Sequence, residues 1–239
     1  MRRVYHRPMS RAARPIRIEA LHLADFVHPG ESTLAGRAGV VMGYAVVHPD
    51  GVVLFDTGIG FGDPDIESAY RPTVRSVVAE LRERSIESDD VVAIATSHLH
   101  FDHCGQNQAF PGVPIHVQAA EYAAAHEADY TIPGWVDFTG ARYELHDGPG
   151  ELLPGIHLWP SPGHSPGHQA MLVEAADGRT LFAGQAVYTA AEWAGSDDPT
   201  VSGLASAPDP TAYRRSRKAL RALRPDRVMF GHDLAVVRS

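Results

Sequence analysis

The sequence predicts a mixed α/β fold, because short β-branched apolar runs alternate along the chain with segments of helical periodicity. The runs expected to form strands are 39–48, 52–55, 91–96, 114–117, 170–173, 180–183 and 227–230. The segments expected to form helices are 73–84, 118–127 and 209–223. This order favours sheets that carry helices on their outer faces.

Length and composition predict one globular domain. The chain has 239 residues, of which 44% are hydrophobic and 21% charged, as is usual for a globular protein. We expect residues 1–15, which are basic at their start, to form a flexible arm, and residues 16–239 to form a single domain. Both a monomer and a homodimer agree with this composition.

Charge and hydrophobicity exclude several classes of partner. The formal net charge of −8 argues against nucleic acid. No apolar run approaches the roughly 18 residues that a membrane span requires, so no membrane partner is expected. The basic start continues with Ser10-Arg11-Ala12 instead of an apolar core, unlike a secretory signal, and a cytoplasmic location is predicted.

The first predicted strands end at a carboxylate. Residues 16–24 alternate crudely, and the runs 39–48 and 52–55 are joined by Pro49-Asp50-Gly51, whose residues suit a hairpin turn. Asp56 follows directly. A carboxylate at a strand end either caps a loop or orients a histidine that binds a metal, and the sequence leaves both interpretations open.

A connection and a helix come next. Residues 58–72 lack periodicity and predict a mobile or lid-like connection. Thr73 to Arg84 predicts a helix, because its apolar residues follow the spacing of one buried face: Val74, Val77, Val78 and Leu81.

The segment after the run 91–96 has the composition of a metal site. The pattern His98-x-His100-x-Asp102-His103 places three imidazoles and one carboxylate within six residues, directly after a predicted buried strand. Imidazole is the usual protein ligand of zinc and suits iron as well, and the carboxylate supplies a harder oxygen ligand. For Cys104 a small buried thiol is favoured over a ligand or redox role.

Two later histidines are weaker candidates. His116 lies on the predicted strand 114–117 and His126 on the alanine-rich helix 118–127, and packing is the usual role of both elements. Residues 129–142 form an aromatic segment without periodicity, which is either a pocket wall or plain surface packing.

The last third of the chain supplies further polar residues at turns and strand ends. His164 stands in the turn Ser161-Pro162-Gly163-His164, where proline and glycine fix the backbone, and it is favoured over His168 as a ligand. Gln185 and Tyr188 follow the strand 180–183, and His232 follows the strand 227–230. The basic amphipathic helix 209–223 is expected to be a solvated outer element.

In order and spacing, these motifs resemble the metallo-β-lactamase fold superfamily, and most closely its N-acyl-homoserine lactonase branch. The resemblance implies a four-layer αβ/βα sandwich with the metal site at one edge. It also implies that one metal binds to His98, His100 and His164, and another to Asp102, His103 and His232. Tyr188 would contact the substrate carbonyl. Glyoxalase II shares the first motif, but the chain ends soon after His232 and lacks room for that family's C-terminal helices.

Gln185 departs from the pattern of the family, which has an aspartate bridging both metals at this position. A glutamine offers a carbonyl oxygen but no charge, so only Asp102 opposes the charge of two cations. We expect one or two zinc ions, with a weaker second site; iron or another divalent transition metal would fit the same ligands.

The predicted function is hydrolysis of a small ester-like molecule, most plausibly a lactone, by metal-bound hydroxide. Asp102 would orient the water or move protons, Tyr188 would donate a hydrogen bond to the carbonyl or oxyanion, and Phe101 would line an apolar pocket with residues of 58–72 and 129–142. Two alternatives stay open: an iron-dependent oxidoreductase of the same fold, and a non-catalytic relative that binds a small molecule.

Overall fold

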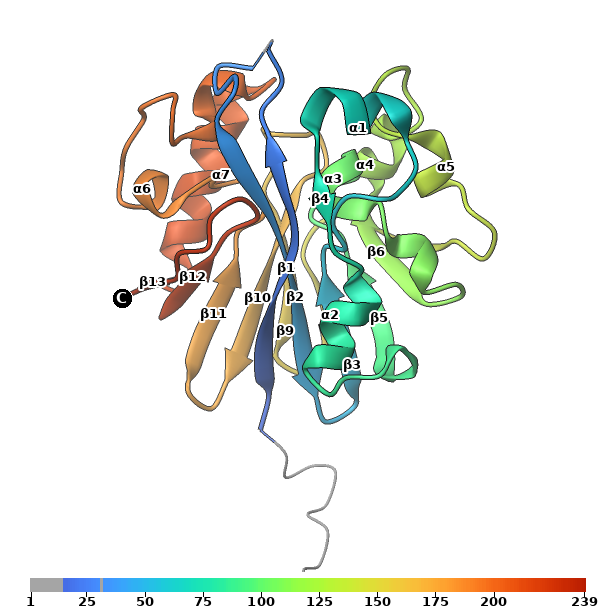
Figure 1. The fold of residues 1–239 in the computed structure, drawn as a ribbon. Coiled ribbons are helices and arrows are strands. Elements are labelled where there is room, and N and C mark those ends of the chain that lie inside the picture. The colour runs from blue at the N-terminus through green and yellow to red at the C-terminus, as the bar shows by residue number, and fades with distance from the viewer. Residues whose placement is uncertain (1–14, 31) are drawn as a thin grey trace, which may run out of the picture.

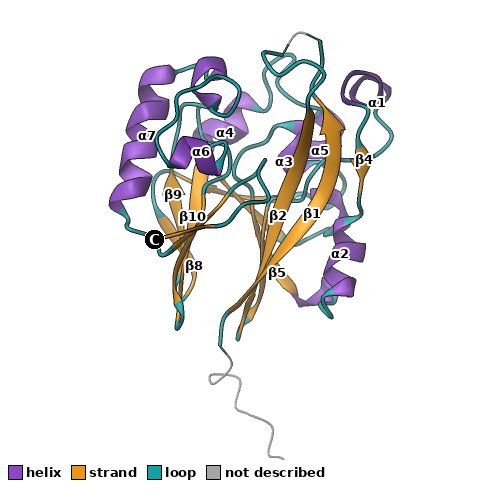
Figure 2. Cartoon of the chain, turned by 60° about the vertical axis from the view of Figure 1, so that its left-hand side comes forward, coloured by secondary structure: helices purple, strands orange, loops and turns teal. Residues whose placement is uncertain are grey.

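The computed structural model describes residues 15–30 and 32–239, so the predicted N-terminal arm lies almost wholly outside the described residues. Two β-sheets pack face to face and helices lie outside both of them, which makes four layers (Figure 1, Figure 2). The predicted α/β sandwich is therefore confirmed. The division into an arm and one domain from residue 16 stays a prediction.

The first sheet has seven strands in the order β4-β1-β2-β3-β5-β6-β7. The strands are β1 (Arg17–Val27), β2 (Ala38–His48), β3 (Gly51–Phe55), β4 (Thr73–Val74), β5 (Val91–Ala95), β6 (Pro114–Gln118) and β7 (Arg142–His146). Strands β3, β5, β6 and β7 are parallel to one another, whereas β1 and β2 form antiparallel pairs. The carboxyl ends of the parallel strands therefore share one edge of the sheet.

The second sheet has six strands in the order β13-β12-β11-β10-β9-β8. The strands are β8 (Gly150–Leu153), β9 (Ile156–Pro160), β10 (Gln169–Ala175), β11 (Gly178–Phe182), β12 (Arg227–Met229) and β13 (Val237–Arg238). Neighbouring strands are antiparallel except β11 and β12, which are parallel. The segments after β11 and β12, which carry Gln185 and His232, therefore leave the same edge.

The core has an apolar layer between the sheets and a further layer outside each sheet. Met171 and Val173 of β10 face the first sheet, where they join Phe55 and other residues of β2, β3 and β5. Leu172 points the other way and packs in a cluster with Leu220 of the long C-terminal helix. Because both faces of β10 are buried, its sequence is a continuous apolar run and not an alternating one.

Seven α-helices lie within the described residues: α1 (Pro64–Tyr70), α2 (Val77–Glu83), α3 (Phe101–Cys104), α4 (Ala119–Ala124), α5 (Pro133–Val136), α6 (Ala190–Trp193) and α7 (Pro210–Ala222). Three 3₁₀ turns, Ser88–Asp90, Asn107–Ala109 and Gly203–Ser206, accompany them. Helix α2 buries Val77 and Leu81 against the first sheet, and α7 covers the second. None of the helices in the described part of the chain is long and apolar enough to cross a membrane.

The structure corrects several predicted elements. The helix expected from Thr73 begins at Val77, because Thr73 and Val74 pair with β1 and Ser76 caps the helix. The segment 58–72, expected to be a mobile or lid-like connection without periodicity, contains the helix α1. This helix buries no residue, so it has no apolar period; the sequence sign was Asp63 as N-cap before Pro64. Strands β7 and β8 were not predicted.

Candidate active site

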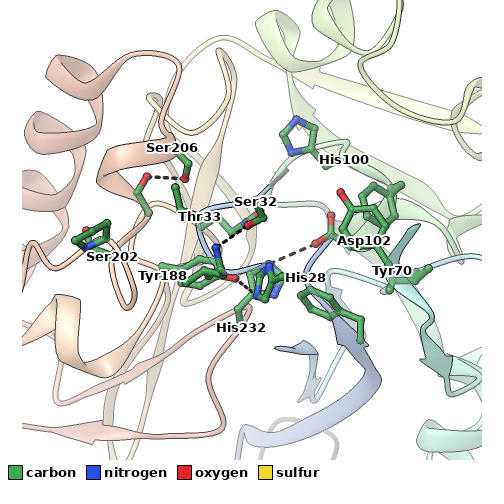
Figure 3. Close-up of a pocket in the computed structure, with 17 residues that line it drawn as sticks. His28, Ser32, Thr33, Tyr70, His100, Asp102, Tyr188, Ser202, Ser206 and His232 are labelled. Carbon is green, nitrogen blue, oxygen red and sulfur yellow. Dashed lines mark hydrogen bonds and ion pairs between the residues drawn. The ribbon is translucent and has the colours of Figure 1, made fainter. Parts of the chain in front are cut away.

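The candidate site is a cavity of about 340 Å³ at the edge where the loops of both sheets meet (Figure 3). Four of the candidate ligands are among its lining residues: His100, Asp102, Gln185 and His232. The other lining residues are Phe26, His28, Ser32, Thr33, Leu34, Ile59, Tyr70, Phe101, Tyr188, Pro199, Ser202, Gly203 and Ser206. The rings of Phe26, Tyr70 and Phe101 pack next to one another, and Ser202 and Ser206 lie on the opposite side of the view from Tyr70 (Figure 3).

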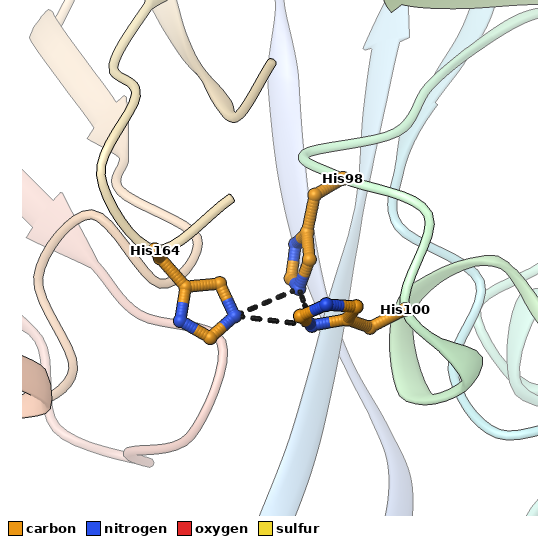
Figure 4. Close-up of side chains that lie close together, drawn as sticks. All are labelled: His98, His100 and His164. Atoms are coloured by element: carbon orange, nitrogen blue, oxygen red, sulfur yellow. Dashed lines mark hydrogen bonds between the residues drawn. The ribbon is translucent and has the colours of Figure 1, made fainter. Parts of the chain in front are cut away.

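Three histidines from both sheets converge beneath this cavity (Figure 4). His98 and His100 follow β5 of the first sheet, and His164 stands in the turn between β9 and β10 of the second. His98 Nε2 lies 3.0 Å from His100 Nδ1 and 3.1 Å from His164 Nε2, and the last two nitrogens are 3.2 Å apart. We call these residues the first triad.

Hydrogen bonds fix which nitrogen of His98 carries its proton. Ser97 Oγ lies 2.8 Å from an oxygen of Asp56, to which it must donate its proton. Ser97 Oγ also lies 3.0 Å from His98 Nδ1, and because its own proton goes to Asp56, it accepts a hydrogen bond from this nitrogen. The lone pair of His98 Nε2 then points at the other two histidines, as a metal ligand requires.

Asp102, His103 and His232 form a second triad beside the first. His103 Nε2 and His232 Nε2 are 3.3 Å apart, and Asp102 Oδ2 lies 3.5 Å and 3.4 Å from them. The outer Nδ1 of His103 donates to Asp56 and that of His232 donates to the carbonyl of Val40, both at 2.8 Å. When both rings are neutral, their inner nitrogens present lone pairs, and the side chains of this triad also come from both sheets.

Burial and charge set the protonation of the site. Burial lowers the pKa of both His98 and His164 well below its usual value, so both are neutral near pH 7. Burial opposes the charge on His103, but Asp102 and Asp56 outweigh it and raise the pKa to about 10. Burial also opposes ionisation of Asp102, yet the adjacent His103 and His232 hold its pKa below the usual range. Metal binding at the second triad would therefore release a proton from His103.

The first triad fits a tetrahedral cation. Zinc bonds to histidine nitrogen at about 2.0–2.1 Å, which places neighbouring nitrogens of a tetrahedron roughly 3.3–3.4 Å apart. The nitrogens of the first triad are separated by 3.0–3.2 Å, so a shift of a few tenths of an ångström suffices. Ligand atoms of His98, Asp102 and His103 also lie within 4.8 Å of one another, so the two triads adjoin.

Tyr188 and Phe101 both line the cavity, as the sequence predicted. The Tyr188 ring packs over the His232 ring at 5.0 Å, and its hydroxyl lies 3.5 Å from His28 Nε2. Burial, with Asp102 nearby, raises the pKa of Tyr188, so the phenol keeps its proton. The side chain is placed to donate a hydrogen bond into the cavity.

The walls differ in part from those predicted. Ile59 and Tyr70 of the segment 58–72 line the cavity, but no residue of 129–142 is among its lining residues. In that segment Tyr130 packs against the His100 ring at 4.7 Å instead. The loop after β1, with His28, and residues 199–206 supply the remaining wall, and their sequences carry no periodicity or motif that marks them.

The other candidate residues have structural partners. His168 Nδ1 lies 2.9 Å from Ser161 Oγ, while its Nε2 accepts from the backbone N–H of Gln185. His116 pairs with His146 at 2.9 Å, and exposed His126 contacts Asp137. Cys104 is buried, and its thiol donates to backbone carbonyl oxygens. Asp56, left open between two roles, orients His103.

A family model described as the metallo-beta-lactamase superfamily matches residues 36–232, which include both triads. The chain belongs to the metallo-beta-lactamase superfamily. The family and fold expected from the sequence are thereby confirmed.

Named relatives within the superfamily are similar over most of the chain. It is 31% identical over 210 residues to the N-acyl homoserine lactonase AiiA of Bacillus thuringiensis subsp. kurstaki, covering 82% of each. It is 30% identical over 204 residues to an N-acyl homoserine lactonase of Bacillus cereus, covering 80% of each. A solved structure of an N-acyl homoserine lactone hydrolase, with the product N-hexanoyl-L-homoserine at its catalytic metal centre, matches with a TM-score of 0.75. Its sequence identity is 27%, over 92% of this chain and 94% of that one.

Gln185 occupies a distinctive position in this superfamily member. Its Oε1 is buried and has no hydrogen-bond partner within the described residues, although a buried amide oxygen ordinarily finds one. Its backbone N–H donates to His168 Nε2 at 2.9 Å, which fixes the start of the segment that leads to Tyr188. The orphan oxygen belongs to a residue that lines the cavity and is an available ligand for a cation.

Proposed function

We propose that this chain hydrolyses lactones, most plausibly N-acyl homoserine lactones, with zinc held by the two triads. One observation carries the proposal: His100 of the first triad, Asp102 and His232 of the second, and Tyr188 all line one cavity together with apolar side chains. In support, the lactonase relatives match over about four-fifths of the chain. The hydrolase predicted from the sequence agrees with these relatives.

We assign one cation to the first triad and a second to Asp102, His103 and His232. A bound divalent cation supplies Lewis acidity to a carbonyl oxygen and lowers the pKa of a coordinated water. Gln185 Oε1 would be a neutral additional ligand. The second site is expected to be the weaker, because Asp102 is its one anionic ligand.

The protein's own groups act on the substrate and on its proton. Asp102, held ionised by its histidine neighbours, accepts a hydrogen bond from the attacking water and orients its oxygen toward the carbonyl carbon. The protonated phenol of Tyr188 donates to the carbonyl oxygen as that oxygen gains charge. Addition of water and cleavage of the ring C–O bond yield a hydroxy acid, with the proton of the water ending on the new hydroxyl.

The two walls of the cavity suit the two parts of an acylated lactone. Phe26, Ile59, Tyr70 and Phe101 offer apolar surface for an alkyl chain, and the hydroxyl-bearing wall suits the amide. A cavity of about 340 Å³ is at the lower end of the range typical for small-molecule sites. We therefore expect short and medium acyl chains to bind within it.

A substrate panel tests the proposal. Zinc-loaded protein is incubated with homoserine lactones of increasing acyl length, a linear alkyl ester and a glutathione thioester, and acid release is followed together with product identification. We expect turnover of the lactones, loss of turnover after dialysis against a chelator, and recovery on adding zinc. Preference for the thioester, or no lactone turnover at any metal loading, would overturn the proposal.

Metal analysis of protein purified without added metal addresses the oxidoreductase alternative. Zinc supports the hydrolase, and stoichiometric iron combined with oxygen uptake would support the oxidoreductase instead. The predicted cytoplasmic location and the oligomeric state stay predictions.

A further inference from the structure

Two fully buried glutamates, Glu121 and Glu192, lie on opposite sides of the site and do not belong to either triad. Burying a carboxylate costs free energy unless hydrogen bonds compensate it, so the groups that donate to a buried carboxylate indicate its structural role. We propose that the two glutamates are positioning residues with separate tasks: Glu121 holds the histidines of the first triad, and Glu192 holds Tyr188 and the neighbouring wall.

Glu121 joins the two loops that carry the first triad. Its Oε1 accepts from the backbone N–H of Leu99, at 2.8 Å, and Leu99 stands between His98 and His100. Its Oε2 accepts from Ser165 Oγ at 2.6 Å and from Gly167 N–H at 3.1 Å, both in the loop that follows His164. One carboxylate therefore ties loops from the two sheets at a fixed separation.

Two further contacts support this role. Tyr130 donates its hydroxyl to Glu121 and packs its ring on His100, so the same carboxylate also fixes that imidazole from the side. At Gly167 an added Cβ would lie 2.2 Å from the Glu121 backbone nitrogen, so the loop reaches Glu121 because it has no side chain there.

Charge gives Glu121 a second effect on the same triad. No ion pair involves Glu121 within the described residues, whereas Glu192 has Arg217 at 3.2 Å. Its two oxygens accept hydrogen bonds from Leu99 N–H, Tyr130, Ser165 and Gly167 N–H, so the carboxylate keeps its negative charge beside the first triad. A cation at the first triad would therefore be attracted by Glu121 without touching it.

Glu192 organises the opposite wall. Its Oε2 accepts from the backbone N–H of Tyr188 at 2.6 Å and from the Tyr213 hydroxyl at 3.0 Å. Its Oε1 accepts from Ser202 Oγ at 2.7 Å. Glu192 thereby fixes the backbone at Tyr188 and the position of Ser202 in the cavity wall. It makes no hydrogen bond to a histidine of either triad among the described residues.

The matched substitutions Glu121→Gln and Glu192→Gln separate the two tasks, because each replaces one acceptor oxygen by an NH₂ group in an equally buried side chain. Co²⁺ titration, followed by the visible absorption of tetrahedral Co²⁺ and by Zn²⁺ competition, measures the first triad directly. For Glu121→Gln we expect affinity to fall about 10- to 100-fold, and for Glu192→Gln to stay within about threefold of the parent. Equal losses in both variants, or parent affinity in folded Glu121→Gln, would overturn the assignment.

The kinetic test of the role of Glu192 rests on the proposed function, because it needs lactone turnover. At saturating zinc, Glu192→Gln should lower kcat by a larger factor than it raises KM. The loss in kcat should not exceed the loss that Tyr188→Phe causes. In a Tyr188→Phe background, Glu192→Gln should have little further effect on kcat. The same loss in both backgrounds would mean that Glu192 serves the fold alone.

Two further measurements test the roles of Glu192 and Glu121 without lactone turnover. The NMR chemical shifts of the His232 ring protons report the position of the Tyr188 ring that stacks on them, and they need no substrate turnover. We expect these chemical shifts to change in Glu192→Gln and to stay the same in Glu121→Gln. Unchanged shifts in Glu192→Gln would contradict its role even if the parent hydrolysed no lactone. If Glu121→Gln does not fold, Ser165→Ala removes one of its bonds and should still weaken Co²⁺ binding several-fold; unaltered binding there would count against the role of Glu121.

Discussion

Asp56 Oδ2 lies 2.8 Å from His103 Nδ1, and both side chains are almost completely buried. The carboxylate also accepts from Ser97 N–H at 2.6 Å and from Ser97 Oγ at 2.8 Å. One residue at the end of β3 therefore sets the proton positions of His103 and, through Ser97, of His98, which belong to different triads.

The first prediction is that Asp56→Asn weakens metal binding at the second triad about 10- to 100-fold, because an amide accepts at one atom only and leaves His103 free to move its proton to Nε2. Zn²⁺ titration by calorimetry measures the change. Asp177→Asn is the control, since that exposed carboxylate pairs with Arg227 and does not line the cavity. Unaltered second-site affinity in Asp56→Asn would show that His103 keeps its tautomer unaided.

The second prediction concerns His164, whose Nε2 is within 3.2 Å of both other nitrogens of the first triad. His164→Ala should abolish lactone hydrolysis and reduce bound metal, because two imidazoles remain where three are needed. Metal content after gel filtration and kcat/KM are measured together. His126→Ala, at an exposed histidine, should change neither. Full metal content in His164→Ala would end the assignment.

The third prediction is that Tyr188→Phe lowers kcat/KM by about five- to 150-fold, equivalent to about 1–3 kcal/mol, as for removal of one donor to a developing oxyanion. The aromatic stacking on His232 is retained, so metal content should hold. The matched control is Tyr122→Phe, whose ring packs against Tyr143 away from the cavity lining. A parent-like kcat/KM would leave Tyr188 with a packing role only.

The fourth prediction is that Gln185→Asp strengthens the second metal site, because it restores a negative charge between two cations that otherwise repel each other. The unmodified protein should release one metal at a lower chelator concentration than the other, and the variant should narrow that gap. Chelator titration at matched pH measures both. Equal and tight binding of two metals by the unmodified protein would contradict the prediction.

The fifth prediction is a pH dependence of stability that arises away from the site. Burial, together with His146 at 2.9 Å, lowers the pKa of His116 to about 4, whereas an unfolded histidine titrates near 6.5. Between these values the unfolded chain binds more protons, so the contribution of His116 is complete above about pH 6.5 and is lost as the pH falls toward 4. Urea midpoints across this range should fall less steeply for His116→Gln than for the parent. Parallel profiles would show that another group carries the dependence.

The sequence indicated most of the clustered histidine and aspartate side chains because these residues are close together along the chain. His98, His100, Asp102 and His103 fall within one short segment after a strand whose apolar composition marks it as buried. The ring of His164 is held by a proline- and glycine-rich turn, which the sequence also displays. Clusters of this kind can be predicted without knowledge of tertiary contacts.

The parts that sequence did not predict depend on contacts between distant segments. Glu121 stands in an alanine-rich helix, where a glutamate ordinarily faces solvent, and only the approach of the loop at Gly167 buries it. His28 and residues 32–34, which follow β1, line the cavity, and no local sequence pattern marks them. The strands β7 and β8 are half-buried and short, so neither has a clear alternating pattern.

Each triad takes two ligands from the first sheet and one from the second. A cation bound at either triad would therefore cross-link the two halves of the sandwich, in addition to the catalytic role proposed for it. Ligand that binds only the folded state at a thousand times its Kd adds about 4 kcal/mol to the free energy of unfolding. If the proposed sites hold metal, the cohesion of the two sheets depends on the metal supply, and loss of the metal would lower both the activity and the free energy of unfolding.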